Sequence, residues 1–361
     1  MIMRRFVAYL PKLIASVLRD YGQYNRQLPA INFIVGGLDN RLVRQSLSMV
    51  GSEIVWNIEV TELNASVLDR LNWISADDDN NLYVLDSEGN CTKVNYSGNE
   101  VWRYNDGIES YSYLMGLAVS SDQEVFVGQP TGKVLKLNPN GEFSWVYEFS
   151  GNKKIRAIQL DNDGNIYVLY YDEWGTWGDH ITKLNPDGSF NKDIRADVWP
   201  GFIIDWDQPG YRVQMYLDKV NGKIYVGGVD STDSGSKEPA YRVFDLDLDL
   251  IRQANLDYQS GGSEQVFDIF TDEDENVFVT IGYNTEGEPN IFKMTDEGVE
   301  MWRNAAVLGE RLTRITPGPD GNIYASCWNT DRIIRFDSEG VRDDGWSLEP
   351  GIEDIVDLIV R

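Results

Sequence analysis

Histidine and cysteine are almost absent from this chain of 361 residues, which contains one His and two Cys. His180 is therefore the one imidazole available for acid–base chemistry, and metal sites built from several histidines are excluded. Cys91 and Cys327 form no CxxC pair, so the sequence indicates neither a zinc site nor a disulfide framework. We therefore expect no metal site and no cofactor.

Basic residues are also scarce, since 32 Lys and Arg stand against 58 Asp and Glu and give a formal net charge of −26. A surface of this sign repels phosphate backbones, so the composition argues against nucleic-acid binding. The acids are spread along the whole chain, which favours solubility as their role, with a surface for cations or a basic partner as the alternative. Runs of 18 apolar residues are absent, and we expect no membrane span.

The first 29 residues differ from the rest because they combine basic and apolar side chains. Pro11 is tolerated in the first turn of a helix, and the spacing predicts an amphipathic helical arm over residues 1–29. A signal peptide is the alternative, disfavoured because Lys12 and Arg19 interrupt the apolar part and no A-x-A cleavage site follows. The residues that define the arm are Arg4, Arg5, Phe6, Leu10, Leu13, Ile14, Val17 and Leu18.

Six segments repeat one pattern, in which an apolar strand, a tight polar turn and a strand centred on an aromatic residue follow one another. The central aromatic residues are Tyr83, Phe126, Tyr167, Tyr225, Phe278 and Tyr324. Nine positions before each of them lie Ile74, Leu117, Ile158, Tyr216, Ile269 and Ile315. This offset is constant while the repeat length varies, so the pattern predicts a rigid hairpin and places the length variation in other loops.

Each hairpin leads to a third strand and then, after a turn that contains glycine, to a fourth. The fourth strand often ends on tryptophan, as at Trp102, Trp145 and Trp302. Four antiparallel strands per repeat are typical of a β-propeller blade. We interpret the regularly spaced aromatic residues as packing between blades.

The two ends of the chain complete each other. Before the first full repeat, INFIVGG, RLVRQSLS and EIVWNIEV supply three strands without an innermost one, and the chain finishes on IEDIVDLIVR. Pairing the last segment with the first leaves no open sheet edge. We therefore predict an all-β fold, a seven-bladed β-propeller over residues 30–361 that the C-terminal strand closes, with the helical arm over residues 1–29.

The G-x-x-x-W ends and hairpins such as DGNIYV resemble the propeller repeats of the quinoprotein-like (PQQ-like) and NHL-like superfamilies. The resemblance covers about residues 30–361 and implies the fold, with a β-helix as the minor alternative. It says little about function, because propellers host many unrelated activities. It carries no cofactor to this chain, since no quinone or calcium motif matches residue by residue.

Three hairpin turns read D-x-D-x-N, beginning at Asp77, Asp161 and Asp272. Clustered carboxylates suit calcium, but an EF-hand loop needs a glycine at its sixth position and a glutamate at its twelfth. Asp and Asn side chains also satisfy backbone amides within turns. We favour turn chemistry, with calcium as the alternative.

Two insertions, in and after the predicted fourth blade, combine indoles with carboxylates. Loops after the second and fourth strands of a blade emerge on one face, so these insertions converge in space, as do shorter extensions in the fifth and sixth blades. Indoles that only pack the loops onto the blades are the alternative. The predicted ligand- or partner-binding residues are Asp172, Glu173, Trp174, Trp177, His180, Trp199, Phe202 and Trp206.

No nucleophile elbow, phosphate-binding glycine loop or metal constellation is present, so we predict no catalytic residue and no enzyme. The favoured function is an interaction scaffold anchored by its arm among other protein subunits, in a virion component such as a bacteriophage tail or capsid appendage. The basic arm on an acidic disc and the weak signal-peptide pattern are the grounds. The alternatives are a secreted or periplasmic glycan-binding propeller and, after it, a propeller hydrolase or lyase.

Overall fold

The described residues are all-β and contain strands and turns without a helix. Among these residues, no helix is long and apolar enough to span a membrane. The computed structural model describes residues 31–37, 42–50, 53–57, 71–86, 89–95, 99–106, 108, 116–151, 153–172, 178–196, 202–203, 215–231, 237–256, 266–281, 290–304, 312–327, 330, 332–348 and 355–360.

Six blades each consist of consecutive antiparallel strands, and we name each blade by its first and last strand. The β4–β7 blade contains β4 (Leu71–Ala76), β5 (Leu82–Asp86), β6 (Cys91–Val94) and β7 (Glu100–Tyr104). The β8–β11 blade contains β8 (Gly116–Val119), β9 (Val125–Gly128), β10 (Lys133–Leu137) and β11 (Phe143–Glu148). The β12–β15 blade contains β12 (Lys153–Leu160), β13 (Ile166–Asp172), β14 (Gly178–Leu184) and β15 (Phe190–Arg195).

The other three blades follow in the same order. The β17–β20 blade contains β17 (Met215–Asp218), β18 (Lys223–Ser231), β19 (Lys237–Asp245) and β20 (Leu250–Asn255), and the short strand β16 (Phe202–Ile203) also pairs with β18. The β21–β24 blade contains β21 (Val266–Thr271), β22 (Val277–Ile281), β23 (Ile291–Met294) and β24 (Glu300–Asn304). The β25–β28 blade contains β25 (Leu312–Pro317), β26 (Ile323–Cys327), β27 (Arg332–Phe336) and β28 (Arg342–Leu348).

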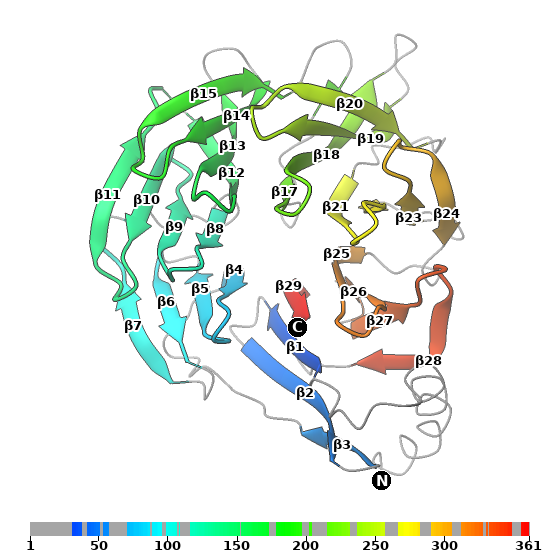
Figure 1. Ribbon diagram of the computed structural model, residues 1–361. Helices are drawn as coiled ribbons and strands as arrows, with labels where there is room; N and C mark the ends of the chain where they lie inside the picture. The colour runs from blue at the N-terminus through cyan, green and yellow to red at the C-terminus, as the bar shows by residue number, and fades with distance from the viewer. Residues whose placement is uncertain are drawn as a thin grey trace.

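A closing sheet joins the two ends of the chain. It contains β1 (Ile31–Gly37), β2 (Leu42–Val50), β3 (Glu53–Asn57) and the last strand, β29 (Ile355–Val360), in the order β29-β1-β2-β3. Phe33 lies opposite Val360 and Val35 lies opposite Leu358. The predicted pairing of the C-terminal segment with INFIVGG is therefore confirmed, and β29 contacts the innermost strands β4 and β25 on either side (Figure 1).

The architecture predicted from the sequence requires correction. The propeller has six blades, whereas the sequence predicted seven four-stranded blades with the last one shared by the two ends of the chain. The strands β29, β1, β2 and β3 form the closing sheet, and the β17–β20 blade gains a fifth strand, β16. No helix occurs in the described residues, and the predicted arm over residues 1–29 lies outside them. Helical spacing of apolar residues is a local signal, whereas a short helix draws most of its stability from tertiary packing, which spacing does not report.

The tryptophan of a fourth strand packs against a glycine in the next blade. A Cβ on Gly141 would lie 2.5 Å from the ring of Trp102, and a Cβ on Gly340 would lie 2.5 Å from the ring of Trp302. Both glycines sit in turns with positive φ, 81° and 77°. Trp102 also donates a hydrogen bond from Nε1 to the carbonyl of Pro139 at 3.0 Å. The G-x-x-x-W pattern is thus a contact between neighbouring blades.

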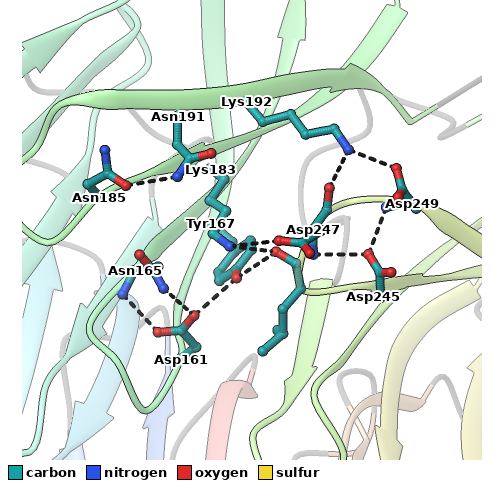
Figure 2. Close-up of polar contacts among 11 residues, drawn as sticks. Asp161, Asn165, Tyr167, Lys183, Asn185, Asn191, Lys192, Asp245, Asp247 and Asp249 are labelled. Atoms are coloured by element: carbon teal, nitrogen blue, oxygen red, sulfur yellow. Dashed lines mark hydrogen bonds and ion pairs between the residues drawn. The ribbon is translucent and has the colours of Figure 1, made fainter.

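The seam between the β12–β15 and β17–β20 blades lacks both members of this contact. Lys192 takes the position that Trp145 holds in the preceding blade, and Leu248, with a φ of 62°, takes the position of the glycine. The Lys192 ammonium donates to the carbonyl of Asp247 and, at 2.8 Å, to Oδ1 of Asp249 (Figure 2). Polar contacts therefore replace the indole at this seam.

The contact between tryptophan and glycine yields a stability prediction. We expect Gly141→Ala to lower the free energy of unfolding by about 2–4 kcal/mol, because alanine is strained at positive φ and its Cβ meets the Trp102 ring. Gly321→Ala is the matched control, since Gly321 has a φ of 78° and open space around its Cβ position. Its expected cost is about 1 kcal/mol. Equal losses in urea unfolding would show that the indole contact contributes nothing.

Candidate functional site

The connections of the propeller define two faces. We call the face with the connections after second and fourth strands the loop face, and the face with the tight turns after first and third strands the turn face. The second strands β5, β9, β22 and β26 have four or five residues. In contrast, β13 has seven residues and β18 has nine. All second strands begin directly after a tight turn at the turn face. The extra residues of β13 and β18 therefore lie at the other end of these strands, toward the loop face.

The structure places only some of the predicted binding residues. Asp172 and His180 lie at the loop-face ends of β13 and β14, on either side of the insertion. Phe202 belongs to β16, where its backbone pairs with Asp230 near the loop-face end of β18. Glu173, Trp174, Trp177, Trp199 and Trp206 lie outside the described residues, as do the arm residues Arg4, Arg5, Phe6, Leu10, Leu13, Ile14, Val17 and Leu18.

His180 belongs to a buried polar cluster on the side of the β12–β15 blade that faces β8–β11. Its Nδ1 lies 3.0 Å from Oδ2 of Asp193, and because a carboxylate only accepts, Nδ1 carries the proton. Asp193 also accepts hydrogen bonds from the hydroxyls of Tyr170 at 2.9 Å and Thr182 at 2.5 Å. The imidazole stacks on the Tyr170 ring with 5.2 Å between centroids. These contacts fix the orientation of the only histidine in the chain.

Charge and burial in this cluster set the protonation of its members. Burial would raise the pKa of Asp193, but the hydrogen bonds from His180, Thr182 and Tyr170 outweigh it and hold the pKa below its ordinary value. Burial, the charge of Asp193 and the hydrogen bond to it raise the pKa of Tyr170. Asp193 is therefore a carboxylate at neutral pH, and Tyr170 is a phenol that donates to it.

Asp172 anchors the same end of the blade. Its buried carboxylate forms an ion pair with Lys153, the first residue of β12, and the Lys153 ammonium lies 5.6 Å from the centre of the Tyr170 ring. Asp172 and His180 lie on the same side of the blade, since Asp172 is two residues after Tyr170 on β13 and His180 is paired directly opposite Tyr170 on β14. The ion pair between Lys153 and Asp172 lies where β13 ends and the insertion begins, and it contacts the His180 cluster through the ring of Tyr170.

A second polar cluster lies on the opposite side of the blade, toward β17–β20. Arg156 is unpaired in the register between β12 and β13, and its guanidinium lies 3.3 Å from Oδ1 of Asp179. The same guanidinium stacks over the Tyr171 ring at 5.2 Å. Arg242 of the next blade donates from Nη1 to the carbonyl of Ala196 at 2.8 Å. Buried ion pairs therefore stabilise both sides of the β12–β15 blade at its loop-face end.

The D-x-D-x-N turns lie on the turn face, away from this site. Oδ1 of Asp77 accepts the backbone N–H of Asn81 at 2.9 Å, and Oδ2 accepts its side-chain amide at 2.8 Å. Asp161 binds Asn165 in the same way, with both distances at 2.8 Å. The first aspartate of each turn therefore serves its own backbone. Within the part of the chain that the structure describes, no group of three His, Cys, Asp or Glu could hold a metal ion.

Reasoning from the sequence missed four residues of the site: Tyr170, Asp193, Arg156 and Tyr171. The signal for Asp193 was its place in a fourth strand, where the corresponding positions hold Arg103 and Arg303. A single carboxylate there, opposite Thr182 and two residue pairs from His180, indicates a buried polar pair. The extra residue that frees Arg156 from pairing in β12 recurs at the same place in β4, β21 and β25, directly after the apolar residue twelve positions before the central aromatic residue.

Comparison with solved structures identifies the fold. A protein from Lactobacillus plantarum matches with a TM-score of 0.64 at 13% identity, over 92% of this chain and 100% of its own. Virginiamycin B lyase from Staphylococcus aureus matches with a TM-score of 0.55 at 15% identity, over 79% of this chain and 85% of the lyase. BamB from Moraxella catarrhalis matches with a TM-score of 0.53 at 15% identity, over 90% of this chain and 91% of BamB.

At these identities the likeness shows the fold alone. It confirms the propeller repeat and the resemblance to quinoprotein-like and NHL-like propellers, because BamB and the lyase are structures of that type. No protein-family model and no curated protein matches the chain. The protein is thus a propeller scaffold, and the similar structures are of mixed kinds, with none pointing to a virion component.

The His180 cluster yields a prediction about pH. We expect Asp193→Asn to lower the free energy of unfolding by about 1–3 kcal/mol near neutral pH, because the amide cannot accept the charge-assisted hydrogen bonds equally well. The folded-state pKa lies below the unfolded value, so the contribution of the carboxylate is complete above about pH 4 and disappears as the pH falls through the folded value.

Chemical unfolding across this pH range therefore should show the two proteins converging in acid. The control is Asp163→Asn, an exposed aspartate in a turn of the same blade, with an expected change within about 0.5 kcal/mol. A gap between Asp193→Asn and the wild type that persists or widens in acid would contradict the assignment.

Proposed function

We propose that this propeller scaffold binds a protein partner, without catalysis, through the loop-face end of the β12–β15 and β17–β20 blades. The observation that carries the proposal is the extension of these two blades, in which β13 has seven residues and β18 and β19 have nine each. Strands that run past the rest of the ring hold their connecting loops out from the face. A rigid base of this kind lowers the entropy that the loops lose on binding.

The buried clusters at the base support the same proposal. The Lys153–Asp172 and Arg156–Asp179 ion pairs have side chains that are at most 14% exposed. Removing either partner would leave a buried charge, so each pair fixes one arrangement of the strand ends. Between these ends, the insertion carries Trp174 and Trp177, residues of the type that dominates the energy of protein interfaces.

The similar structures offer no support for a virion component or for a glycan ligand, whereas protein partners agree with the mixed set of propellers. The proposal therefore commits to a protein partner at the loop face, and the glycan becomes an outcome of its test.

The test compares partner binding by loop variants. Immobilised wild type would capture proteins from its source cells, and direct titration of the enriched protein would then give the affinity. We expect the double variant Trp174→Ala and Trp177→Ala to weaken this affinity by about 10- to 100-fold, the range for anchor tryptophans at interfaces. The thermal unfolding midpoint should stay unchanged, because the substitutions lie in a connection between strands.

Phe190→Ala provides the matched control, since Phe190 is an exposed aromatic residue on the outer strand of the same blade. It should bind as the wild type does. Equal affinity for the tryptophan variant and the wild type would contradict the proposal. Saturable sugar binding that only the tryptophan variant loses would replace the protein partner with a glycan.

A second candidate function, acid–base catalysis, has one observation in its favour. Asp193 orients and polarises the single imidazole, as a general base requires, and one of the similar propellers is a virginiamycin B lyase made catalytically inactive by replacing a histidine with alanine. The side chain of His180 is only 10% exposed, which limits access of a substrate and favours the binding function. Turnover of any substrate that His180→Gln abolishes, with folding intact, would establish catalysis instead.

A further inference from the structure

The turn face of the propeller is densely acidic. The twelve five-residue turns after the first and third strands together contain 22 Asp and Glu residues and one basic residue, Lys219. Some of these carboxylates serve their own turns, as Asp77 and Asp161 do. Seven cations of the adjacent strands each form an ion pair with a turn acid, namely Lys93, Lys136, Lys183, Lys192, Lys223, Arg252 and Lys293. The exposed acids of the turns include Asp78, Asp163, Asp274 and Glu339. These seven cations and Lys219 are fewer than the 22 acids, so the turn face keeps an excess of negative charge.

The first described residue, Ile31, lies on this face. Every innermost strand of a blade runs from the loop face to the turn face, and β29, the innermost strand of the closing sheet, ends at Val360 opposite Phe33. Because β1 is antiparallel to β29, its first residue, Ile31, lies at the turn face. The segment before Ile31 thus joins the propeller where the acidic turns are.

The charge of this segment is opposite to that of the face. Residues 1–30 contain five basic residues and one acidic residue, a net charge of +4. Since the whole chain has a net charge of −26, residues 31–361 carry a net charge of −30. Thirty residues span roughly 45 Å as a helix or about 100 Å extended, and a folded domain of this length has a radius of gyration of about 20 Å. The segment is long enough to cross the face from which it starts.

Exposed apolar side chains adjoin the same turns. Val220 lies in a hairpin turn and is 91% exposed. Phe143, Phe190 and Leu250 each open a fourth strand directly after a turn, and all are more than half exposed. Large apolar side chains grouped beside charges are typical of interaction surfaces.

We propose that residues 1–30 dock onto the turn face of their own chain, with their basic residues against the exposed turn carboxylates and their apolar side chains against Phe143, Phe190, Val220 and Leu250. The turn face is then occupied by this chain, and the loop face is the surface that stays open to a partner. The proposal goes beyond the proposed function and uses the opposite face, so each can fail without the other.

Zero-length carbodiimide coupling tests the proposal, because it joins an amine to a carboxylate only where the two form an ion pair. Lys12 is the only lysine in residues 1–30. We expect Lys12 to couple to acids of the turns, with a yield that falls about tenfold in roughly 1 M salt, where the screening length is about 3 Å. The Lys192–Asp249 pair, 2.8 Å apart, is the internal standard for coupling within the folded disc.

Two arm variants separate charge from sequence. Arg4→Gln, Arg5→Gln and Arg19→Gln together should lower coupling from Lys12 about tenfold at low salt, whereas replacing the same three residues with lysine should preserve it. Unchanged coupling in the glutamine variant, or coupling of Lys12 to loop-face acids such as Glu238, overturns the proposal. In a mixture of isotope-labelled and unlabelled protein, products that join the two forms overturn it in favour of a second copy.

Discussion

The pairing of β1 with β29 is the constraint on which the rest of the structure depends. It joins residues separated by more than 300 positions, yet the entropic cost of closing a loop grows only slowly with its length. Once the closing sheet forms, β29 contacts both β4 and β25, and the ring loses its open edges. Every blade then has a neighbour on each side, which is the condition for the contact of Trp102 with Gly141 and for its repeats around the ring. The local motif is thus meaningful only within the closed ring.

Closure also divides the chain's chemistry between two faces. At the turn face, short turns repeat the same hydrogen bonds, in which Asp77 and Asp161 accept from backbone N–H groups of their own turns. These hydrogen bonds leave little room for the turns to change in length. At the loop face, connections are free to lengthen without disturbing the ring. The β12–β15 and β17–β20 blades use this freedom, and the ion pairs of Asp172 and Asp179 hold the lengthened ends in place. Function is therefore expected where the repeat is broken, while the regular face is left to the chain itself.

The sequence was sufficient for what the repeat determines. The constant spacing to Tyr83 and its five equivalents identified the hairpins, and the leftover segments at both ends identified the closing pair. It was insufficient where a residue is defined by its neighbours across a sheet. Asp193 gains its role from Thr182, Tyr170 and His180 on two other strands, and Arg156 gains its role from an unpaired position in β12. Seven blades were predicted from six repeats and the two end segments, whereas the propeller has six, and the repeat does not reveal the added strand β16. Apolar spacing in residues 1–29 likewise describes a local preference and not what the segment packs against.

The blades with extended loop-face ends are also the pair whose turn-face seam lacks tryptophan and glycine. There Lys192 and Leu248 replace the indole and the glycine, and polar contacts to Asp249 take over. The same seam is also held by a shared apolar core that includes Leu169, Ile181, Ala240 and Phe244. Arg242 adds a hydrogen bond to Ala196 near the loop face. The seam therefore stays closed without the indole, because the polar contacts of Lys192, the apolar core and the hydrogen bond of Arg242 hold the two blades together. A binding surface built on this pair of blades gains rigidity from these contacts between them.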